Sequence, residues 1–135
     1  MPPRFLLDSS ACIPVLRNKA GLEKLPDPLQ TAIPVIVAAE LWTGVKKNLK
    51  THPQHAAKLE AFLGFFQVAD FDLAAALHYA DIRAVLEAKG QSIGPLDLLI
   101  AAQARSLGAT LVTGNVSEFK RVKGLKTMLW RAPGG

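Results

Sequence analysis

The sequence is poor in cysteine and contains no long apolar run. Cys12 is the single cysteine among 135 residues, which excludes an internal disulfide and a zinc site built on several thiolates. No stretch approaches the roughly 18 apolar residues that a membrane-spanning helix needs, and residues 1–7 lack the apolar core of a signal peptide. We therefore expect a cytoplasmic protein with no membrane partner.

The composition is that of a folded protein with a basic surface. Apolar residues make up 50% of the chain and charged residues 20%, so we expect one domain over residues 1–135, with disorder confined to Pro133–Gly135. The net charge of +5 favours contact with polyanions such as nucleic acid, although many basic proteins bind none. The basic residues form two groups: Lys46, Lys47 and Lys50, and then Lys120, Arg121, Lys123 and Lys126.

Apolar runs and helical periodicity predict strands that alternate with helices. The predicted strands cover residues 5–7, 32–37, 68–71, 110–113 and 126–130. The predicted helices cover residues 11–17, 38–47, 53–66, 72–89, 95–107 and 116–119, and glycines at 90 and 108 are expected to end two of them. This alternation indicates an α/β protein with a parallel sheet covered by helices on both faces.

Acidic side chains fall at the ends of these elements. Asp8 ends the first predicted strand, Glu40 and Asp97 lie in the first turns of two predicted helices, and Asn115 and Glu118 follow a later strand. Because ligands of open parallel sheets bind beyond the carboxyl ends of the strands, where the strand order reverses, these five side chains could converge there.

Clustered carboxylates imply a cation. They repel one another, and burial increases the repulsion, so such a cluster is poorly tolerated unless a cation neutralises it. Oxygen ligands without thiols or paired histidines favour Mg²⁺ or Mn²⁺ over Zn²⁺. Such an ion supports phosphodiester hydrolysis because it activates water and neutralises charge at phosphorus.

Each of these polar residues also has a purely structural explanation. Asp8 could cap the helix that follows it, Glu40 could complement a helix dipole, and Asn115 and Glu118 could be a turn residue and a solvated acid. Asp97 differs because its neighbours are nearly all apolar, so a charge there is costly unless it is matched. The hypothesis of a metal site therefore depends on all five residues taken together and not on any one of them.

Other chemistries find less support in the sequence. The serines and the cysteine that follow Asp8 have no evident base partner for nucleophilic catalysis, and the three histidines lack a spacing suited to shared metal ligation. A receiver-like phosphoacceptor domain would share the alternating pattern. It needs adjacent acids after its first strand, whereas two serines follow Asp8 here.

Four motifs, in this order, resemble those of PIN-domain ribonucleases, specifically the VapC toxins of bacterial toxin–antitoxin modules. The motifs are LLDSS at residues 6–10, AELWTGV at 39–45, IGPLDLLIAA at 93–102 and LVTGNVSEF at 111–119. The resemblance covers nearly the whole chain. It implies a single PIN domain, a three-layer α/β/α fold with a five-stranded parallel sheet.

The resemblance also assigns roles to individual residues. It implies Mg²⁺ or Mn²⁺ held by Asp8, Glu40 and Asp97, with Glu118 as a further catalytic acid, and supporting roles for Ser9, Thr113 and Asn115. It implies cleavage of structured RNA such as tRNA, with arrest of translation and growth, and the candidates for RNA binding are Lys46, Lys47, Lys120 and Arg121.

The resemblance finally implies partners and leaves one alternative open. VapC proteins typically form homodimers and are silenced by a VapB-type antitoxin, whose C-terminal segment enters the acidic groove. The amide at Asn115 subtracts a charge from the expected metal site. The alternative is therefore a PIN domain that binds RNA or a protein without cutting.

Overall fold

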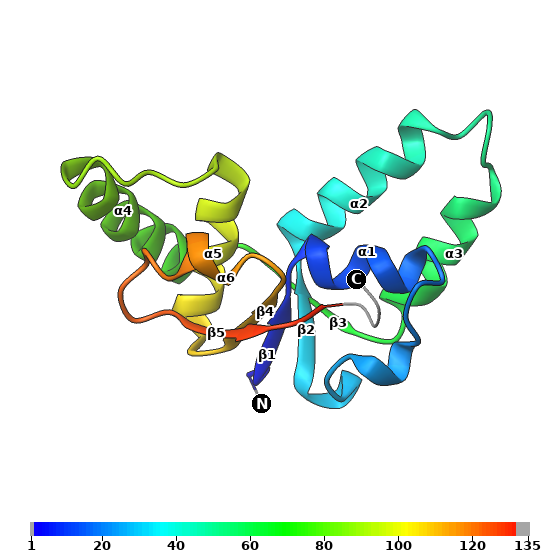
Figure 1. The fold of residues 1–135 in the computed structure, drawn as a ribbon, viewed down its shortest axis with the longest axis horizontal. Helices are drawn as coiled ribbons and strands as arrows, with labels where there is room; N and C mark the ends of the chain where they lie inside the picture. Colours follow the sequence, from blue (N-terminus) through cyan, green and yellow to red (C-terminus); the bar gives the residue numbers. More distant parts are fainter. Residues whose placement is uncertain (1, 132–135) are drawn as a thin grey trace.

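A five-stranded parallel sheet forms the centre of the molecule (Figure 1). The computed structural model describes residues 2–131, so the expectation about residues 133–135 lies outside the described residues. The sheet order is β3-β2-β1-β4-β5. The strands are β1 (Phe5–Leu7), β2 (Thr31–Pro34), β3 (Gln67–Ala69), β4 (Thr110–Thr113) and β5 (Lys126–Leu129). The predicted α/β class and the five-stranded parallel sheet are confirmed.

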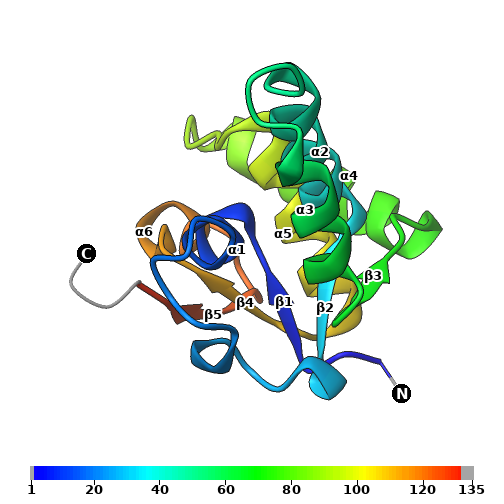
Figure 2. The same ribbon diagram turned by 90° about the vertical axis from the view of Figure 1, so that its right-hand side faces the viewer.

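Helices cover both faces of this sheet. In residues 2–131 the α-helices are α1 (Ser9–Leu16), α2 (Val35–Lys47), α3 (Gln54–Leu63), α4 (Leu73–Ala88), α5 (Pro95–Leu107) and α6 (Val116–Phe119). Helices α1, α2 and α3 lie on one side of the sheet and α4, α5 and α6 on the other (Figure 1). Figure 2 shows α2 and α3 lying side by side. Every helix of the described chain is too short or too polar to cross a bilayer.

The central strands are buried on both faces. Leu6 and Leu7 of β1 and Leu111 and Val112 of β4 have no exposed surface. Strands covered on both sides read as continuous apolar runs, and each fully buried leucine stabilises the fold by about 1.5–3 kcal/mol. These two strands therefore give a rigid base to the residues at their carboxyl ends.

The strand order reverses between β1 and β4. From β1 the chain builds β2 and β3 on one side, and it then crosses to build β4 and β5 on the other. In open α/β sheets this switch point opens a crevice at the carboxyl ends of the two strands. Asp8 and Thr113 lie at these ends.

Two predicted helix ends are confirmed. Gly90 and Gly108 both have a φ of 64°, the left-handed conformation that a residue with a Cβ adopts only with strain. Gly108 is the C-cap residue of α5, and Gly90 follows Lys89, the C-cap residue of α4. The sequence thus marks where these helices stop.

The predicted strand over residues 32–37 is wrong in its second half. Strand β2 ends at Pro34, and α2 begins at Val35. The β-branched run favours a strand locally, but Val37 is fully buried against the core, and burial of a helix face outweighs local propensity. As a consequence, Glu40 lies in the second turn of α2 and not in its first.

Candidate active site

Four acidic side chains gather at the carboxyl edge of β1 and β4. Asp8 precedes α1, and the other three acids lie on α2, α5 and α6: Glu40, Asp97 and Glu118. Helices α2 and α5 contact each other. The charges of the other three acids all raise the pKa of Asp97, which shows that the four carboxyl groups share one electrostatic environment.

Asp8 is the most deeply buried of these acids, with 5% of its surface exposed. Thr113 Oγ1 donates to its Oδ2 atom at 2.6 Å, and the hydroxyl of Ser10 donates to its Oδ1 atom. The backbone N–H of Ala11 donates to Oδ1 at 3.3 Å, so Asp8 also caps α1. These donors replace water lost on burial and fix the carboxylate. Asp8 therefore caps α1, and at the same time it presents a fixed carboxylate at the edge of the sheet.

Ser10, and not Ser9, lies against Asp8. Besides donating to Asp8, Ser10 Oγ accepts from the backbone N–H of Gly114 at 2.8 Å, which ties the turn after β1 to the turn after β4. Within residues 2–131 the hydroxyl of Ser9 makes no hydrogen bond to the acids. The resemblance to the family motif points to Ser9, the first hydroxyl after Asp8. In the structure the orientation of α1 instead places Ser10 against Asp8 and the turn after β4.

Asp97 and Glu118 form a coupled pair at the start of α5. Glu118 Oε1 accepts from the N–H of Gly94, the N-cap residue of α5, at 2.9 Å. This bond lowers the pKa of Glu118. Burial, and then the charge of Glu118, raise the pKa of Asp97 to about 6. Of the two acids, Asp97 is therefore the one that binds a proton more readily, and Glu118 is the one that stays ionised to lower pH.

Asn115 and Arg121 help to keep Glu118 ionised. The Asn115 side-chain amide donates to Glu118 Oε2 at 2.5 Å, and the charge of Arg121 also lowers the pKa of Glu118. An acid at position 115 would instead face Glu118 as a like charge. Asn115 is thus bonded within the acidic site, in addition to its place in the turn after β4.

Glu40 is half-buried at the border of the site. Burial, and then the charge of Asp8, raise the pKa of Glu40. The helix dipole favours an acid in the first turn of a helix. Because α2 begins at Val35, Glu40 lies beyond that first turn. The structural explanation for Glu40 therefore loses its basis.

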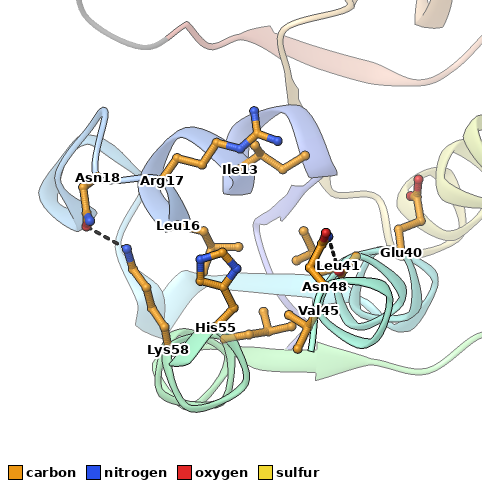
Figure 3. A pocket seen from close by; sticks show the side chains of 12 residues that line it. Ile13, Leu16, Arg17, Asn18, Glu40, Leu41, Val45, Asn48, His55 and Lys58 are labelled. Carbon is orange, nitrogen blue, oxygen red and sulfur yellow. Dashed lines mark hydrogen bonds between the residues drawn. The ribbon is translucent and has the colours of Figure 1, made fainter. Parts of the chain in front are cut away.

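Glu40 also lines one end of a groove of about 470 Å³ between α1, α2 and α3 (Figure 3). The apolar lining residues are Ile13, Leu16, Leu41, Val45 and Leu59. The polar lining residues other than Glu40 are Arg17, Asn18, Asn48, His55 and Lys58. In Figure 3, Glu40 lies at one end of the groove and Asn18 and Lys58 at the other. Glu40 thus belongs both to the groove and to the group of four acids.

The donor chemistry of the site suits a hard cation. Its carboxylate oxygens are ligands that Mg²⁺ and Mn²⁺ prefer. Burial, and then the charges of neighbouring carboxylates, raise the pKa values of Glu40 and Asp97, and a bound cation would offset both effects. In residues 2–131, no three Asp, Glu, His or Cys side chains are arranged as the ligand set of one ion. Since Mg²⁺ keeps several waters and takes one or two carboxylates, the arrangement fits a hydrated dication better than a cage of three acids.

The basic residues expected to bind RNA lie in the last turn of α2 and directly after α6, and both of these helices carry one of the acids. Lys46 and Lys47 form the exposed last turn of α2, and the Lys46 ammonium lies 5.9 Å from the centre of the Trp42 ring. Lys120 and Arg121 directly follow α6, and Arg121 donates to the carbonyl of Ser92 at 3.1 Å. Each of the two acids, Glu40 and Glu118, is therefore followed within a few residues of sequence by a pair of basic side chains.

The sequence matches known proteins over nearly its full length. Residues 5–125 match the PIN domain family. The chain is 37% identical over 130 residues to the protein named tRNA(fMet)-specific endonuclease VapC of Shigella flexneri. This alignment covers 94% of this chain and 98% of that protein. It is 38% identical over 131 residues to Ribonuclease VapC2 of Rickettsia felis, with 93% and 97% covered.

The fold also matches solved structures. DNA-bound VapBC from Salmonella typhimurium contains a chain that superposes with a TM-score of 0.89 at 35% identity, covering 96% of this chain and 99% of that one. VapBC2 from Rickettsia felis, bound to a DNA fragment of its promoter, gives a TM-score of 0.84 at 36% identity, with 94% and 98% covered.

Proposed function

Because the chain belongs to the PIN domain family and is related to VapC ribonucleases over nearly its whole length, we propose that it is a metal-dependent endoribonuclease, the toxin of a VapBC-type module. The observation that carries the proposal is the gathering of four carboxyl groups at the switch point between β1 and β4. Their mutual repulsion opposes folding, so the cluster is best explained by a cation that offsets it.

The metal would be held by Asp8 and Asp97 with Glu40 beside them, directly or through water. When bound, Mg²⁺ or Mn²⁺ supplies an activated water and neutralises charge developing on the phosphodiester. The protein's own part is to orient the acids: Thr113 and Ser10 hold both oxygens of Asp8. Since metal ligands must be deprotonated, Asp97 would have to be ionised to hold the cation.

The proposed substrate is structured RNA, with tRNA(fMet) as the first molecule to test. This choice follows from the name of the Shigella flexneri relative. Lys46, Lys47, Lys120 and Arg121 would contact RNA phosphates on either side of the acidic site. Cleavage of a tRNA would arrest translation and growth.

The proposed partner is a VapB-type antitoxin, and the proposed assembly is a cytoplasmic homodimer bound to it. The solved relatives are VapBC complexes, which supports such a partner for this chain. A C-terminal segment of the antitoxin in this groove would cover Glu40, because Glu40 lines the groove.

Brief induction of the protein in bacterial cells tests this function. The natural chain is expected to arrest growth and to create new RNA 5′ ends at few positions within tRNA. The Asp97→Asn variant should fold and accumulate equally but do neither, whereas Asp70→Asn, which changes an exposed acid after β3, should behave as the natural chain. Toxicity retained by Asp97→Asn would contradict the assignment.

A second candidate is a PIN domain that binds RNA or a protein without cutting it. The observation that favours it is Asn115, whose amide replaces a potential charge beside Glu118. The same induction experiment separates the two functions. Growth arrest without new RNA ends would favour this second candidate.

A further inference from the structure

The groove between α1, α2 and α3 carries opposite charges at its two ends (Figure 3). Glu40 lies at one end and Lys58 at the other, and Arg17 and His55 line the groove between them. In residues 2–131 the ion pairs are Arg83–Glu87 and Arg105–Asp81, so the Arg17 guanidinium and the Lys58 ammonium of the groove have no carboxylate partner there. Their charge is available to an incoming anion.

A hydrogen bond between α3 and the turn after α1 holds the end of the groove that carries Lys58. Lys58 Nζ donates to Asn18 Oδ1 at 2.8 Å, across 40 positions of sequence. Asn18 has a φ of 59°, a left-handed conformation that asparagine tolerates better than most residues. This bond uses one of the three N–H donors of the Lys58 ammonium, so two remain for a ligand.

The middle of the groove is aliphatic. Leu41 and Val45 are each 8% exposed and Leu59 is 1% exposed, so they form a firm floor beneath the opening. Single-stranded bases are recognised mainly by stacking on aromatic rings, but the groove lining has no aromatic ring besides the imidazole of His55. Aliphatic walls suit the apolar side chains of a peptide, which dock in such grooves.

We propose that Arg17, His55 and Lys58 form an anion subsite that receives a carboxylate of a partner's peptide segment docked in this groove. The occupant is an aliphatic segment with an acidic side chain or its C-terminal carboxylate at the α1–α3 end. The opposite orientation would place that anion beside Glu40, where like charges repel. The subsite thus sets the direction of the segment, and its regulatory meaning rests on the proposed ribonuclease function.

Selection from a random-sequence peptide display library tests the subsite. The natural chain is expected to select peptides with an apolar centre and an acidic group toward one end. Against Arg17→Glu/Lys58→Glu, a selected peptide should bind at least about tenfold more weakly, and the selection should shift to basic residues at that position. Lys89→Glu/Lys126→Glu makes the same charge change at exposed positions outside the groove and should keep the original preference.

Additional variants resolve the source of the carboxylate and guard against misfolding. Lys58→Gln removes the charge but retains a donor for Asn18, so it should fold normally and still weaken peptide binding. Synthesis of the selected peptide with a free or an amidated C-terminus separates a terminal carboxylate from an acidic side chain. Circular dichroism of each variant establishes that it is folded.

Several results would overturn the subsite. They are selected peptides without an acidic group, an acidic preference that persists in Arg17→Glu/Lys58→Glu, or loss of RNA cleavage in this variant with peptide binding intact. The last result would assign the basic end to RNA. The natural chain could also select the expected peptides and yet cut no RNA. That result would contradict the proposed function and would still support the subsite.

Discussion

Asp97→Asn is expected to stabilise the metal-free fold while it abolishes RNA cleavage. Burial and the neighbouring charge of Glu118 raise the pKa of Asp97 from 3.8 to about 6 in the folded protein. The folded state therefore binds this proton more tightly than the unfolded state does. Proton binding by Asp97 therefore stabilises the fold. This stabilisation is fully present below the ordinary pKa of 3.8 and is lost as the pH rises through about 6, whereas Asp97→Asn keeps an uncharged group at every pH.

The magnitude follows from this pKa change. A rise from 3.8 to about 6 corresponds to about 3 kcal/mol at about 1.36 kcal/mol per pH unit. Asp97 is half-exposed, so screening by solvent reduces this figure to about 1–2 kcal/mol. For a chain of this length the gain corresponds to a rise in Tm of about 3–6 °C.

Thermal unfolding in EDTA, followed by circular dichroism, measures this effect. At about pH 8 the Tm of Asp97→Asn should exceed that of the natural chain, and the two should converge as the pH falls below 3.8, where the carboxyl group becomes protonated in both states. Glu60→Gln, which neutralises an exposed acid on α3, should change the Tm little. An Asp97→Asn protein that melts at or below the natural chain at the higher pH would refute the reasoning.

Three further predictions concern the metal, Asp8 and the fold. Mn²⁺ at about 100 times its Kd should stabilise the natural chain by about 2.7 kcal/mol, and a Tm indifferent to Mn²⁺ would argue against a metal site. Thr113→Val removes the donor to buried Asp8 Oδ2 and should lower the free energy of unfolding in urea by about 1–3 kcal/mol. Gln103, which is 1% exposed, donates to the carbonyls of Ala69 and Asp70, so Gln103→Leu should cost about 1–3 kcal/mol and leave RNA cleavage by the folded protein intact; equal urea stability would contradict this contact.

The sequence was sufficient to predict where the acids lie because they follow strong local signals. The apolar runs before Asp8 and Thr113 mark strands, and Gly94–Pro95 marks the start of the helix that bears Asp97. Parallel strands bring their carboxyl ends to one edge of a sheet, so the convergence follows from the pattern. The structure places these acids in one electrostatic environment, as that argument expects.

What the sequence could not predict depends on rotation and tertiary burial. The start of α2 was misplaced because Val35–Val37 are apolar and β-branched, and this composition suits a buried strand and a buried helix face equally. The contact of Ser10 with Asp8 depends on how α1 turns after β1. Similarly, the bond from Gly94 to Glu118 joins residues 24 positions apart, and no periodicity reports such a contact.

The groove was also beyond the reach of local patterns. Its lining residues come from α1, α2 and α3 and the turns beside them, and each is explained separately as core or as solvated surface. Only the packing of the three helices shows that Glu40 and Lys58 occupy the same groove (Figure 3). Opposite charges at its ends are therefore a property of the fold.

Incubation of the purified protein with a tRNA pool, in Mn²⁺ or in EDTA, tests most directly whether the acidic cluster is a metal-dependent nuclease. The natural chain is expected to produce discrete fragments in Mn²⁺ and none in EDTA, and Glu40→Gln is expected to produce far fewer fragments in Mn²⁺ than the natural chain does. Fragments that form equally in EDTA, or an undiminished yield from Glu40→Gln, would contradict the account.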